Sequence, residues 1–367
     1  MNKNNVDVAV FIPSFGNGGA DRMSVHICRG LSQLNYKVDL IVKNNTTNIK
    51  KYFLHNTRIV RLSSLRKKRI KELTDYIKIN KPKVILSTKG GDFEAIRAKK
   101  LAEFKTKVVL RHGTTFSKRD SFRPFLKRVI SAIKLRWLFS QADLIIVNSY
   151  GVAQDIIKIA KISEKKIKVV PNPTIVPEMF EMAKQEVDHP WFKDKRYPII
   201  LGAGGFRKSK DFLTLIKAFS LLQRHTPSRL VILGEGRQRK KMEKLINELN
   251  IKDKVWLPGH QENPYKFMAR SDVFVLSSLW EGCPNVLIEA MALGIPVVST
   301  DCPSGPREIL DNGRYGKLVP MQCPEKMATG ILEYLKNPAQ REFIKKGIER
   351  FELKNSIEAY LKVLELS

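Results

Sequence analysis

The stretch VFVLSSLWEGCPNVLIEAMALGIPVVSTD, residues 273–301, places a strand, a helix and a second strand within 29 residues. Its two ends are short runs rich in Val and other apolar residues, which are typical of strands buried on both faces. The middle has helical character and is followed by Gly294 and Pro296, residue types that commonly end a helix. Strand–helix alternation of this kind predicts a parallel sheet with helices on both faces.

The same alternation runs through the whole chain in two series. The first series predicts strands at 6–12, 37–42, 84–87, 107–110, 144–147 and 168–170. The second predicts strands at 199–203, 230–233, 254–257, 273–276, 296–300 and 317–319. A proline-rich segment without strong periodicity, residues 169–198, lies between the two series and is interpreted as a linker. The sequence therefore predicts an α/β protein with two doubly wound, Rossmann-like domains that face a cleft.

The expected domains are an N-terminal one at 1–180, a C-terminal one at 181–338, and a final helix at 339–367 that returns toward the N-terminal domain. A chain of 367 residues is long for a single core, which favours this division. No apolar run is long enough to span a membrane, and the first residues do not resemble a signal peptide. Four scattered cysteines indicate neither a disulfide framework nor a zinc site, so we expect a cytoplasmic protein.

The charge is unusually positive and unevenly distributed. The net charge is +30, and residues 1–180 carry 36 Lys/Arg against 13 Asp/Glu, whereas the remainder carry 30 against 23. An excess of this size in one half predicts an anionic partner such as phospholipid headgroups, nucleic acid or a polyphosphate substrate.

Several loops that directly follow predicted strands contain residues suited to binding an anion. After the first strand, Gly18 and Gly19 allow close approach to a ligand at the start of a helix. After the first strand of the second series, Arg207 and Lys210 suit a diphosphate, although a solvated basic turn is an equal alternative for these two. The next loops offer Gly234, Glu235 and His260. Neither the G-x-G-x-x-G fingerprint nor a Walker sequence is present.

Glu281 and Glu289 lie eight residues apart around the start of the helix in the opening stretch. We expect Asn285 to cap this helix and to leave the amides of Val286 and Leu287 free for a ligand. Glu289 lies within an otherwise apolar helix, where a carboxylate without a partner is costly. A ribose diol is a suitable partner, because carboxylates bind ribose hydroxyls in dinucleotide folds.

Together, the E-x7-E pair and the segments GNGGADR, GFRKSKD, LGEG and PNP closely resemble the retaining glycosyltransferases of family 4, which have the GT-B fold. The resemblance covers essentially the whole chain, and the ordered set is much more specific than E-x7-E alone. It implies a nucleotide-sugar donor, most commonly a uridine one, held mainly by the C-terminal domain. It also implies transfer without a metal or other cofactor to an acceptor held by the N-terminal domain. The region 263–292 looks most like enzymes that extend lipid-linked oligosaccharides or lipopolysaccharide with a hexose or N-acetylhexosamine.

The resemblance also implies roles for individual residues. Arg207 and Lys210 match the pair that neutralises the donor diphosphate, Glu289 the ribose ligand, and Glu281 the glutamate near the donor sugar. Gly18 and Gly19 match the N-terminal glycine loop, and the backbone at 285–287 matches the helix start that faces the diphosphate. His112 stands where a family histidine contacts the transferred sugar, and Asn148 and Ser149 follow another strand and contact acceptor or donor. We expect front-face transfer assisted by the leaving phosphate, since no clear pair of carboxylates suggests a glycosidase-like double displacement.

The segment 123–143 predicts a basic amphipathic helix with a tryptophan, a pattern typical of membrane-surface binding. The residues expected to contact lipid are Arg123, Lys127, Arg128, Lys134, Arg136 and Trp137, with a second cationic cluster at 61–71. We expect one edge of the apolar stripe to pack in the core and the basic rim to contact an anionic membrane, which places the protein on the inner face of the cytoplasmic membrane.

Two other functions are open at this point. A nucleotide-sugar 2-epimerase would have the same fold but no need for a cationic, membrane-facing half. A non-enzymatic polyanion or nucleic-acid binder would explain the charge, yet no recognised nucleic-acid motif is present, and we expect no nucleic-acid partner.

Overall fold

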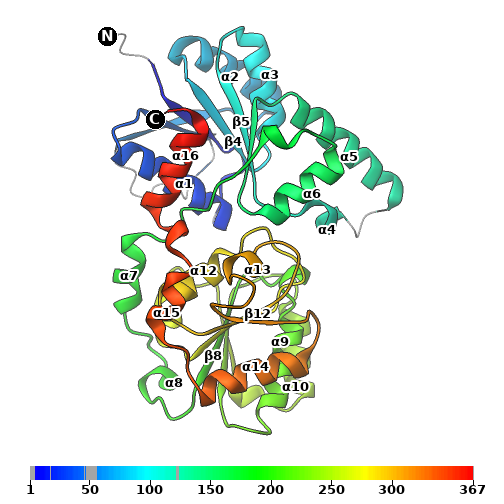
Figure 1. Ribbon diagram of the computed structural model, residues 1–367, viewed down its shortest axis with the longest axis vertical. Helices are drawn as coiled ribbons and strands as arrows, with labels where there is room; N and C mark the ends of the chain where they lie inside the picture. The colour runs from blue at the N-terminus through cyan, green and yellow to red at the C-terminus, as the bar shows by residue number, and fades with distance from the viewer. Residues whose placement is uncertain (1–4, 17, 45, 47–55, 121–123, 367) are drawn as a thin grey trace. The chain divides into compact units, whose positions relative to one another are not determined.

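The computed structural model of the chain describes residues 5–16, 18–44, 46, 56–120 and 124–366. The chain divides into two compact units, coloured along the chain in Figure 1. Met1–Thr174 and Leu353–Ser367 form the first unit, and Ile175–Glu352 form the second. The chain thus leaves the first unit once and returns to it for its last segment.

The first unit is built on a parallel sheet whose seven described strands follow the order β3-β2-β1-β4-β5-β6-β7. Residue Val8 pairs with Val38 on one side and Val84 on the other, so β1 is an interior strand. The strands are β1 (Val8–Phe11), β2 (Val38–Lys43), β3 (Thr57–Leu62), β4 (Val84–Thr88), β5 (Lys107–His112), β6 (Leu144–Val147) and β7 (Ile167–Val169).

Alternate residues of these strands enter two different cores. Phe11, Ile85 and Leu110 pack under α2, α3 and α6, whereas Val10, Leu86 and others pack under α1 and α16. Both faces of the sheet are therefore covered, as continuous Val/Ile/Leu strands require. The helices of this unit are α1 (Gly19–Gln33), α2 (Arg66–Asn80), α3 (Asp92–Ala102), α4 (Phe116–Asp120), α5 (Phe125–Ser140), α6 (Tyr150–Ala160) and α16 (Leu353–Leu364).

The second unit repeats the same design. Its six described strands follow the order β10-β9-β8-β11-β12-β13, all parallel. They are β8 (Ile199–Ala203), β9 (Arg229–Leu233), β10 (Val255–Gly259), β11 (Val273–Leu276), β12 (Val297–Thr300) and β13 (Lys317–Val319). The helices are α7 (Pro177–Lys184), α8 (Pro190–Lys193), α9 (Phe212–Leu222), α10 (Arg239–Glu248), α11 (Tyr265–Met268), α12 (Asn285–Ala292), α13 (Pro306–Ile309), α14 (Pro324–Lys336) and α15 (Arg341–Lys346).

The two predicted strand series and the parallel sheets are confirmed, and three details differ. The sequence does not predict β3, an edge strand in which Arg58, Ile59 and Arg61 are exposed. The segment interpreted as a linker contains α7 and α8, each begun by a proline at the first helical position, where proline is well tolerated. The prediction of a single final helix is wrong, because the segment contains three separate elements: α15, a 3-10 turn at Glu349–Phe351 and α16.

Candidate functional site

Both sheets have the Rossmann strand order. Successive strands are added on one side of the first strand of each sheet, and the chain then crosses to its other side. Ligands of such sheets bind beyond the carboxyl ends of the strands at this switch point. In the second unit the switch point lies between β8 and β11, and the segments that follow these two strands contain Lys210 and Glu281. The predicted residues of this unit therefore come to the edge of the sheet where a ligand is expected.

Lys210 and Glu281 form an ion pair. The Lys210 Nζ lies 2.6 Å from the Glu281 Oε1, and both side chains are largely buried. Ser278 donates a hydrogen bond of 2.6 Å to the same oxygen, and Ser277 donates to the carbonyl of Lys210. The two loops are thus joined by backbone and side chain. Sequence reasoning missed Ser277 and Ser278, although their position at a strand end was a usable signal.

Burial, and secondarily the charge of Glu281, raise the pKa of the nearby Cys302 thiol to about 12. A thiol with such a pKa stays protonated at neutral pH and is a poor nucleophile. The reactive groups beside this pair are therefore charged nitrogen and oxygen atoms rather than sulfur. Arg207, the other predicted cation, is exposed, and it precedes the 3-10 turn Lys208–Lys210.

Glycines let the backbone of neighbouring loops approach one another beside Lys210. Gly204 and Gly234 both have positive φ, and a Cβ on Gly234 would lie 1.9 Å from the carbonyl oxygen of Gly204. The Cε of Lys210 lies 3.2 Å from the position of a Cβ on Gly204. The predicted close-approach role of Gly234 thus has a local structural cause, whether or not a ligand is bound.

Glu235 and His260 follow β9 and β10, which are adjacent strands. The Glu235 carboxylate is exposed and accepts hydrogen bonds from Arg239, one helical turn later, which lowers the pKa of Glu235. His260 is exposed and directly follows Gly259, the last residue of β10. Both residues lie at the ligand-binding edge of the sheet, with Glu235 already paired.

The start of α12 differs from the prediction. Pro284, not Asn285, is the cap residue, and Asn285 is the first residue of the helix. The amide of Leu287 is not free, because it donates to the carbonyl of Pro284 at 3.0 Å. Val286 occupies the second helical position. Proline at 284 fixes the backbone direction into the helix without a side-chain cap, a role the sequence pattern had given to asparagine.

Glu289 is completely buried in the middle of α12, between apolar neighbours. Glu281 lies in the preceding loop, and the two carboxylates therefore have different surroundings: one is paired with Lys210, whereas the other is enclosed by the helix packing. Two carboxylates with such different surroundings are not equivalent in chemistry.

In the first unit, the glycine loop at the end of β1 is held by an acidic residue. Gly18 is the cap residue of α1, and its amide donates to Oδ2 of Asp21 at 2.9 Å. The Lys89 Nζ, from the loop after β4, donates to both oxygens of Asp21 at 2.6 and 2.7 Å. Gly19 begins α1. Sequence reasoning missed Asp21 and Lys89; the strand end before the pair Gly90–Gly91 was the available signal.

His112 is the last residue of β5, and its ring lies beside Phe116 and Phe139. The His112 Nε2 lies 3.2 Å from Oδ2 of Asp92, a contact that is an ion pair when the ring is protonated. Asn148, after β6, packs against the backbone of Gly113, where a Cβ would be 2.5 Å from its Nδ2. Ser149 caps α6 through a hydrogen bond from Val152, so its hydroxyl already has a structural role.

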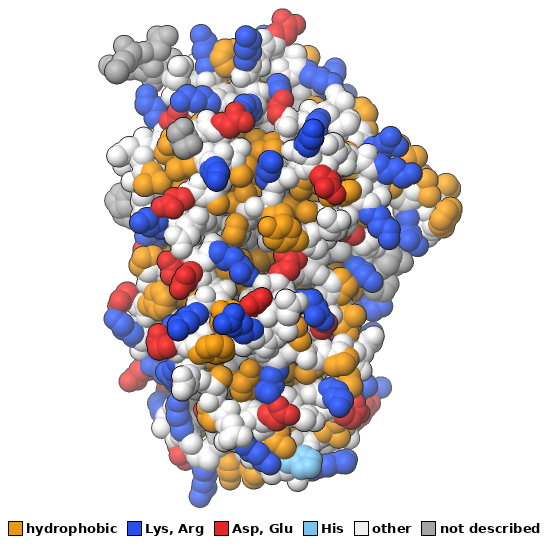
Figure 2. Space-filling model, in the orientation of Figure 1, with side chains coloured by type: hydrophobic (Ala, Val, Ile, Leu, Met, Phe, Trp, Pro, Cys, Tyr) orange, Lys and Arg blue, Asp and Glu red, His pale blue; other side chains and the backbone are white. Residues whose placement is uncertain are grey.

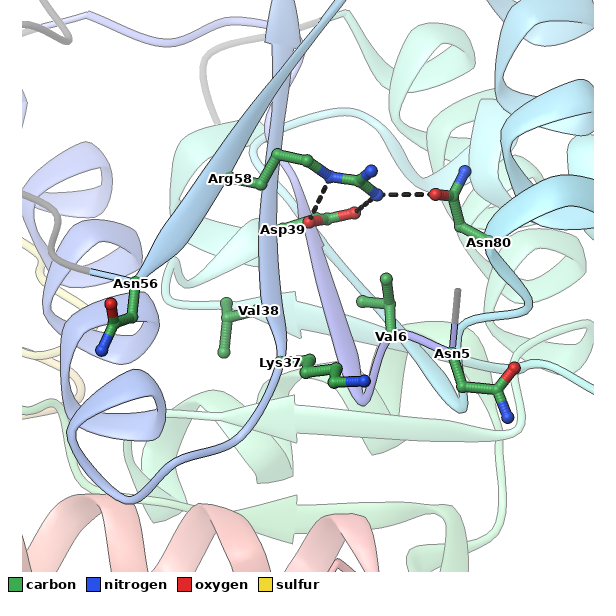
Figure 3. A pocket seen from close by; sticks show the side chains of 8 residues that line it. All are labelled: Asn5, Val6, Lys37, Val38, Asp39, Asn56, Arg58 and Asn80. Carbon is green, nitrogen blue, oxygen red and sulfur yellow. Dashed lines mark hydrogen bonds and ion pairs between the residues drawn. The ribbon is translucent and has the colours of Figure 1, made fainter. Parts of the chain in front are cut away.

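A pocket in the first unit lies at the opposite, amino ends of β1, β2 and β3 (Figure 3). Arg58 donates to both oxygens of the buried Asp39 and also to Asn80. The hydroxyl of Tyr76 donates to Asp39 as well. Because the charge of Arg58 is already neutralised and the pocket is at the wrong end of the sheet, we do not place the substrate there.

The predicted amphipathic helix is α5, and its packing differs from the expectation. Leu135, Leu138 and Phe139 contact the core. The apolar stripe instead faces outward, with Phe125 77%, Leu126 69%, Ile133 63% and Trp137 48% exposed. The basic residues Lys127, Arg128, Lys134 and Arg136 lie on the same helix, whereas Arg123 is outside the described residues.

This exposed surface extends beyond α5. The rings of Trp137 and Phe93, on α3, have centroids 6.0 Å apart, and the guanidinium of Arg66 lies 4.6 Å above Phe93. Arg66 begins α2, where the predicted second cationic cluster lies, and its neighbour Leu65 is 71% exposed. Figure 2 shows apolar and basic side chains mixed along this edge of the unit.

In the described part of the chain, no group of three or more His, Cys, Asp or Glu side chains is arranged to hold a metal ion. None of the helices in those same residues has the length and apolar character needed to cross a bilayer.

Comparisons with known proteins agree with this architecture. The family described as Glycosyltransferase Family 4 matches residues 17–175, and the family described as Glycosyl transferases group 1 matches residues 183–350. An uncharacterized glycosyltransferase of Methanocaldococcus jannaschii is 33% identical over 237 residues, which are 61% of this chain and about half (55%) of that protein's length.

A Campylobacter jejuni enzyme is 31% identical over 360 residues, or 92% of each chain. Its name is N-acetylgalactosamine-N,N'-diacetylbacillosaminyl-diphospho-undecaprenol 4-alpha-N-acetylgalactosaminyltransferase. Among solved structures, Anabaena HepE in complex with UDP and glucose aligns with a TM-score of 0.80 at 16% identity, covering 99% of this chain and all of that one. The lipopolysaccharide outer core galactosyltransferase WaaB aligns with a TM-score of 0.74 at 20% identity, covering 98% and 99%. The two solved structures support the fold alone, whereas the full-length relative supports the family. This chain belongs to the family 4 glycosyltransferases and is an enzyme of the GT-B fold.

Proposed function

We propose that the enzyme transfers a hexose or N-acetylhexosamine, with retention of configuration, from a nucleotide sugar to a membrane-associated glycan. UDP is the first choice of nucleotide, and a polyprenyl-diphosphate-linked oligosaccharide or lipopolysaccharide is the acceptor class. The observation that carries the proposal is the largely buried Lys210–Glu281 pair at the switch point of the second sheet.

The part of the proposal that concerns the donor rests on the positive charge of Lys210 and Arg207. Departure of a nucleoside diphosphate leaves negative charge on phosphate oxygens, and preorganised cations stabilise that charge without reorganisation during the reaction. Lys210 is held in place by Glu281 and by the loop after β11, and Arg207 adds an exposed cation that can bind phosphate bidentately. In this proposal Glu289 binds the ribose, Glu281 lies near the sugar, and no metal or other cofactor takes part.

The part of the proposal that concerns stereochemistry rests on the hydrogen-bond partners of Glu281. A double displacement needs a carboxylate free to attack the anomeric carbon. Glu281 instead accepts hydrogen bonds from both Lys210 and Ser278. We therefore favour front-face transfer, in which the leaving phosphate assists the incoming hydroxyl. A covalent glycosyl-enzyme adduct in the mass spectrum would contradict it.

The part of the proposal that concerns the acceptor rests on the exposed surface of α5 and on the names of relatives. The Campylobacter relative acts on a diphospho-undecaprenol-linked sugar, and two Rhizobium meliloti relatives are lipopolysaccharide core glycosyltransferases. A cytoplasmic enzyme that is peripherally bound through α5, Phe93 and the start of α2 would meet such acceptors at an anionic inner leaflet.

The test begins with the donor. We expect one nucleotide among UDP, GDP, ADP and CDP to raise the unfolding temperature of the protein most strongly, because only a ligand of the folded state stabilises it. Sugars of that nucleotide are then supplied with a polyprenyl-diphosphate-linked acceptor, with and without EDTA, and the product's anomeric configuration is read by NMR. Epimerised donor without acceptor, or no nucleotide binding at all, would contradict the proposal.

A further inference from the structure

We infer that Asp92 is a positioning residue for His112, which fixes the ring nitrogen that carries the proton. The inference rests on the proposed function and on the role that the family resemblance implies for His112, which is contact with the transferred sugar. It concerns a carboxylate that the sequence patterns do not single out and that lies on a different strand–helix connection.

Asp92 is held from two directions at the ligand-binding edge of the first sheet. It begins α3 after β4, and β4 is the direct neighbour of β5, which ends at His112. Asp92 is buried, and its Oδ1 accepts a hydrogen bond of 2.9 Å from Ser87. Its Oδ2 is left for the imidazole, 3.2 Å from Nε2. Asp92 also lies at the start of a helix, a position that favours a carboxylate.

The imidazole is enclosed so that only one nitrogen is turned toward Asp92. The ring of Phe116 lies 5.3 Å from the imidazole, and the ring of Phe139 meets it edge-on at 5.1 Å. The Nε2 atom is buried, and its contact with Asp92 is not yet aligned as a hydrogen bond. Hydrogen bonds of catalytic groups are often long or poorly aligned before substrate binds and tighten in the complex.

The tautomer of a neutral histidine is set by the hydrogen bond of its other nitrogen. A carboxylate accepts hydrogen bonds and cannot donate them when ionised, so Asp92 favours the proton on Nε2. Nδ1 then carries the lone pair and accepts a hydrogen bond from a sugar hydroxyl. Asp92 thus acts through His112, as a buried carboxylate orients an imidazole in hydrolase triads.

The test uses full-length protein with 15N-labelled histidine and compares Asp92→Ala, Asp92→Asn and Glu94→Ala. Glu94 is a matched control, because it is a buried carboxylate in the same first turn of α3 that pairs with Arg69 instead. The protein has six histidines, and His112→Gln assigns the relevant signal. Wild type should show the Nε2–H tautomer at His112, and Asp92→Ala should shift it toward a mixture.

In transfer assays, Asp92→Ala should lower kcat about tenfold, since one lost hydrogen bond in the transition state costs about that factor. Asp92→Asn should not recover the loss: Ser87 donates to the remaining oxygen, so the amide NH2 faces Nε2 and should shift His112 toward the Nδ1–H tautomer. The affinity for the nucleoside diphosphate should not change, and Glu94→Ala should keep the wild-type tautomer and kcat.

An Nδ1–H tautomer in wild type, or equal kcat losses in Asp92→Ala and Glu94→Ala, would overturn the inference. If Asp92→Ala does not fold, the wild-type and Asp92→Asn spectra decide it alone. If no sugar transfer is found for any donor, the proposed function fails while the NMR result still decides whether Asp92 sets the tautomer.

Discussion

The Lys210 Nζ and the Glu281 Oε1 lie 2.6 Å apart across the switch point of the second sheet, with Ser278 bonded to the same carboxylate oxygen. The pair joins the loops after two adjacent strands, so the cation is already in place before a diphosphate arrives. In the proposed reaction, the phosphate oxygens compete with Glu281 for the ammonium group of Lys210.

Lys210→Met should weaken binding of the nucleoside diphosphate about 10- to 100-fold, because a hydrogen bond to a charged group contributes about 1.5–3 kcal/mol and the largely buried Glu281 loses its cationic partner. Isothermal titration calorimetry measures this affinity directly. Lys241→Met removes the same charge from an exposed site on α10 and is the control. Similar losses in both variants would mean that net charge, and not Lys210, is responsible.

Glu289→Ala and Glu281→Ala should separate binding from transfer. Glu289→Ala should weaken nucleoside diphosphate binding about tenfold or more, through the lost ribose contact. Glu281→Ala should mainly lower turnover at saturating donor while nucleoside diphosphate binding is kept. The measurements are calorimetry and steady-state kinetics, and an equal loss of plain nucleotide binding in both variants would contradict this division.

Ile133→Ser should weaken binding to anionic vesicles about tenfold, because it removes a large apolar side chain from the exposed face of α5 that we propose enters the headgroup region. Ile79→Ser is a closely matched control: Ile79 is 61% exposed and Ile133 63%, and both belong to the first unit. Co-sedimentation at low salt gives both affinities. If wild type does not sediment with vesicles, or if Ile79→Ser weakens sedimentation as much, the membrane surface is wrongly placed.

The second unit should lose stability as the pH falls below about 6.5, the ordinary value for histidine. Burial lowers the pKa of His189, so the unfolded chain takes up the proton first and the stability contributed by the neutral ring is lost as pH falls through the folded pKa. The ring stacks on Trp256 at 3.8 Å and accepts a hydrogen bond from the amide of Trp191.

Denaturant unfolding at several pH values, followed by tryptophan fluorescence, measures this dependence. His189→Asn keeps an acceptor at the start of α8 but does not titrate, so its stability should be lower and flatter with pH between about 5 and 7. The same slope in wild type and variant would assign the effect to another group.

Gly234→Ala should lower the free energy of unfolding by about 3 kcal/mol or more, because its Cβ would meet the carbonyl oxygen of Gly204 and its φ is +141°. Gly330→Ala, in the middle of α14, meets only ordinary contacts and should be neutral or stabilising by up to about 1 kcal/mol. Denaturant titration compares them. Equal stability of the two variants would show that the backbones of Gly204 and Gly234 do not approach one another closely.

The fold was readable from the sequence because buried parallel strands are continuous apolar runs. Such runs gave both series, and the strand ends gave the positions of Lys210, Glu281 and His112. The edge strand β3 was hidden, since its exposed arginines interrupt the apolar pattern. Likewise α7 and α8 were hidden by prolines, which begin these two helices but are read as breakers in a proline-rich segment.

Side-chain partners were much less predictable than positions. Nothing in the spacing of Asp92 and His112, or of Asp21 and Lys89, indicates contact, because these pairs meet only after strands β1, β4 and β5 align. The apolar stripe of α5 could be recognised from the sequence, but its direction could not. An amphipathic pattern is the same whether the stripe packs in the core or faces outward. Only the observed packing shows that Leu135, Leu138 and Phe139 form the inner edge.

The return of the chain to the first unit sets an order of folding during synthesis. Tyr360 of α16 is completely buried, accepts a hydrogen bond from Arg111 and packs in the same core as α1, and Ile357 lies against Gly30. That core cannot close until residues 353–364 have left the ribosome, whereas the second unit is complete once residue 352 has emerged. The nascent first unit therefore waits with this sheet face covered by α1 but not yet by α16, which leaves apolar surface exposed during synthesis.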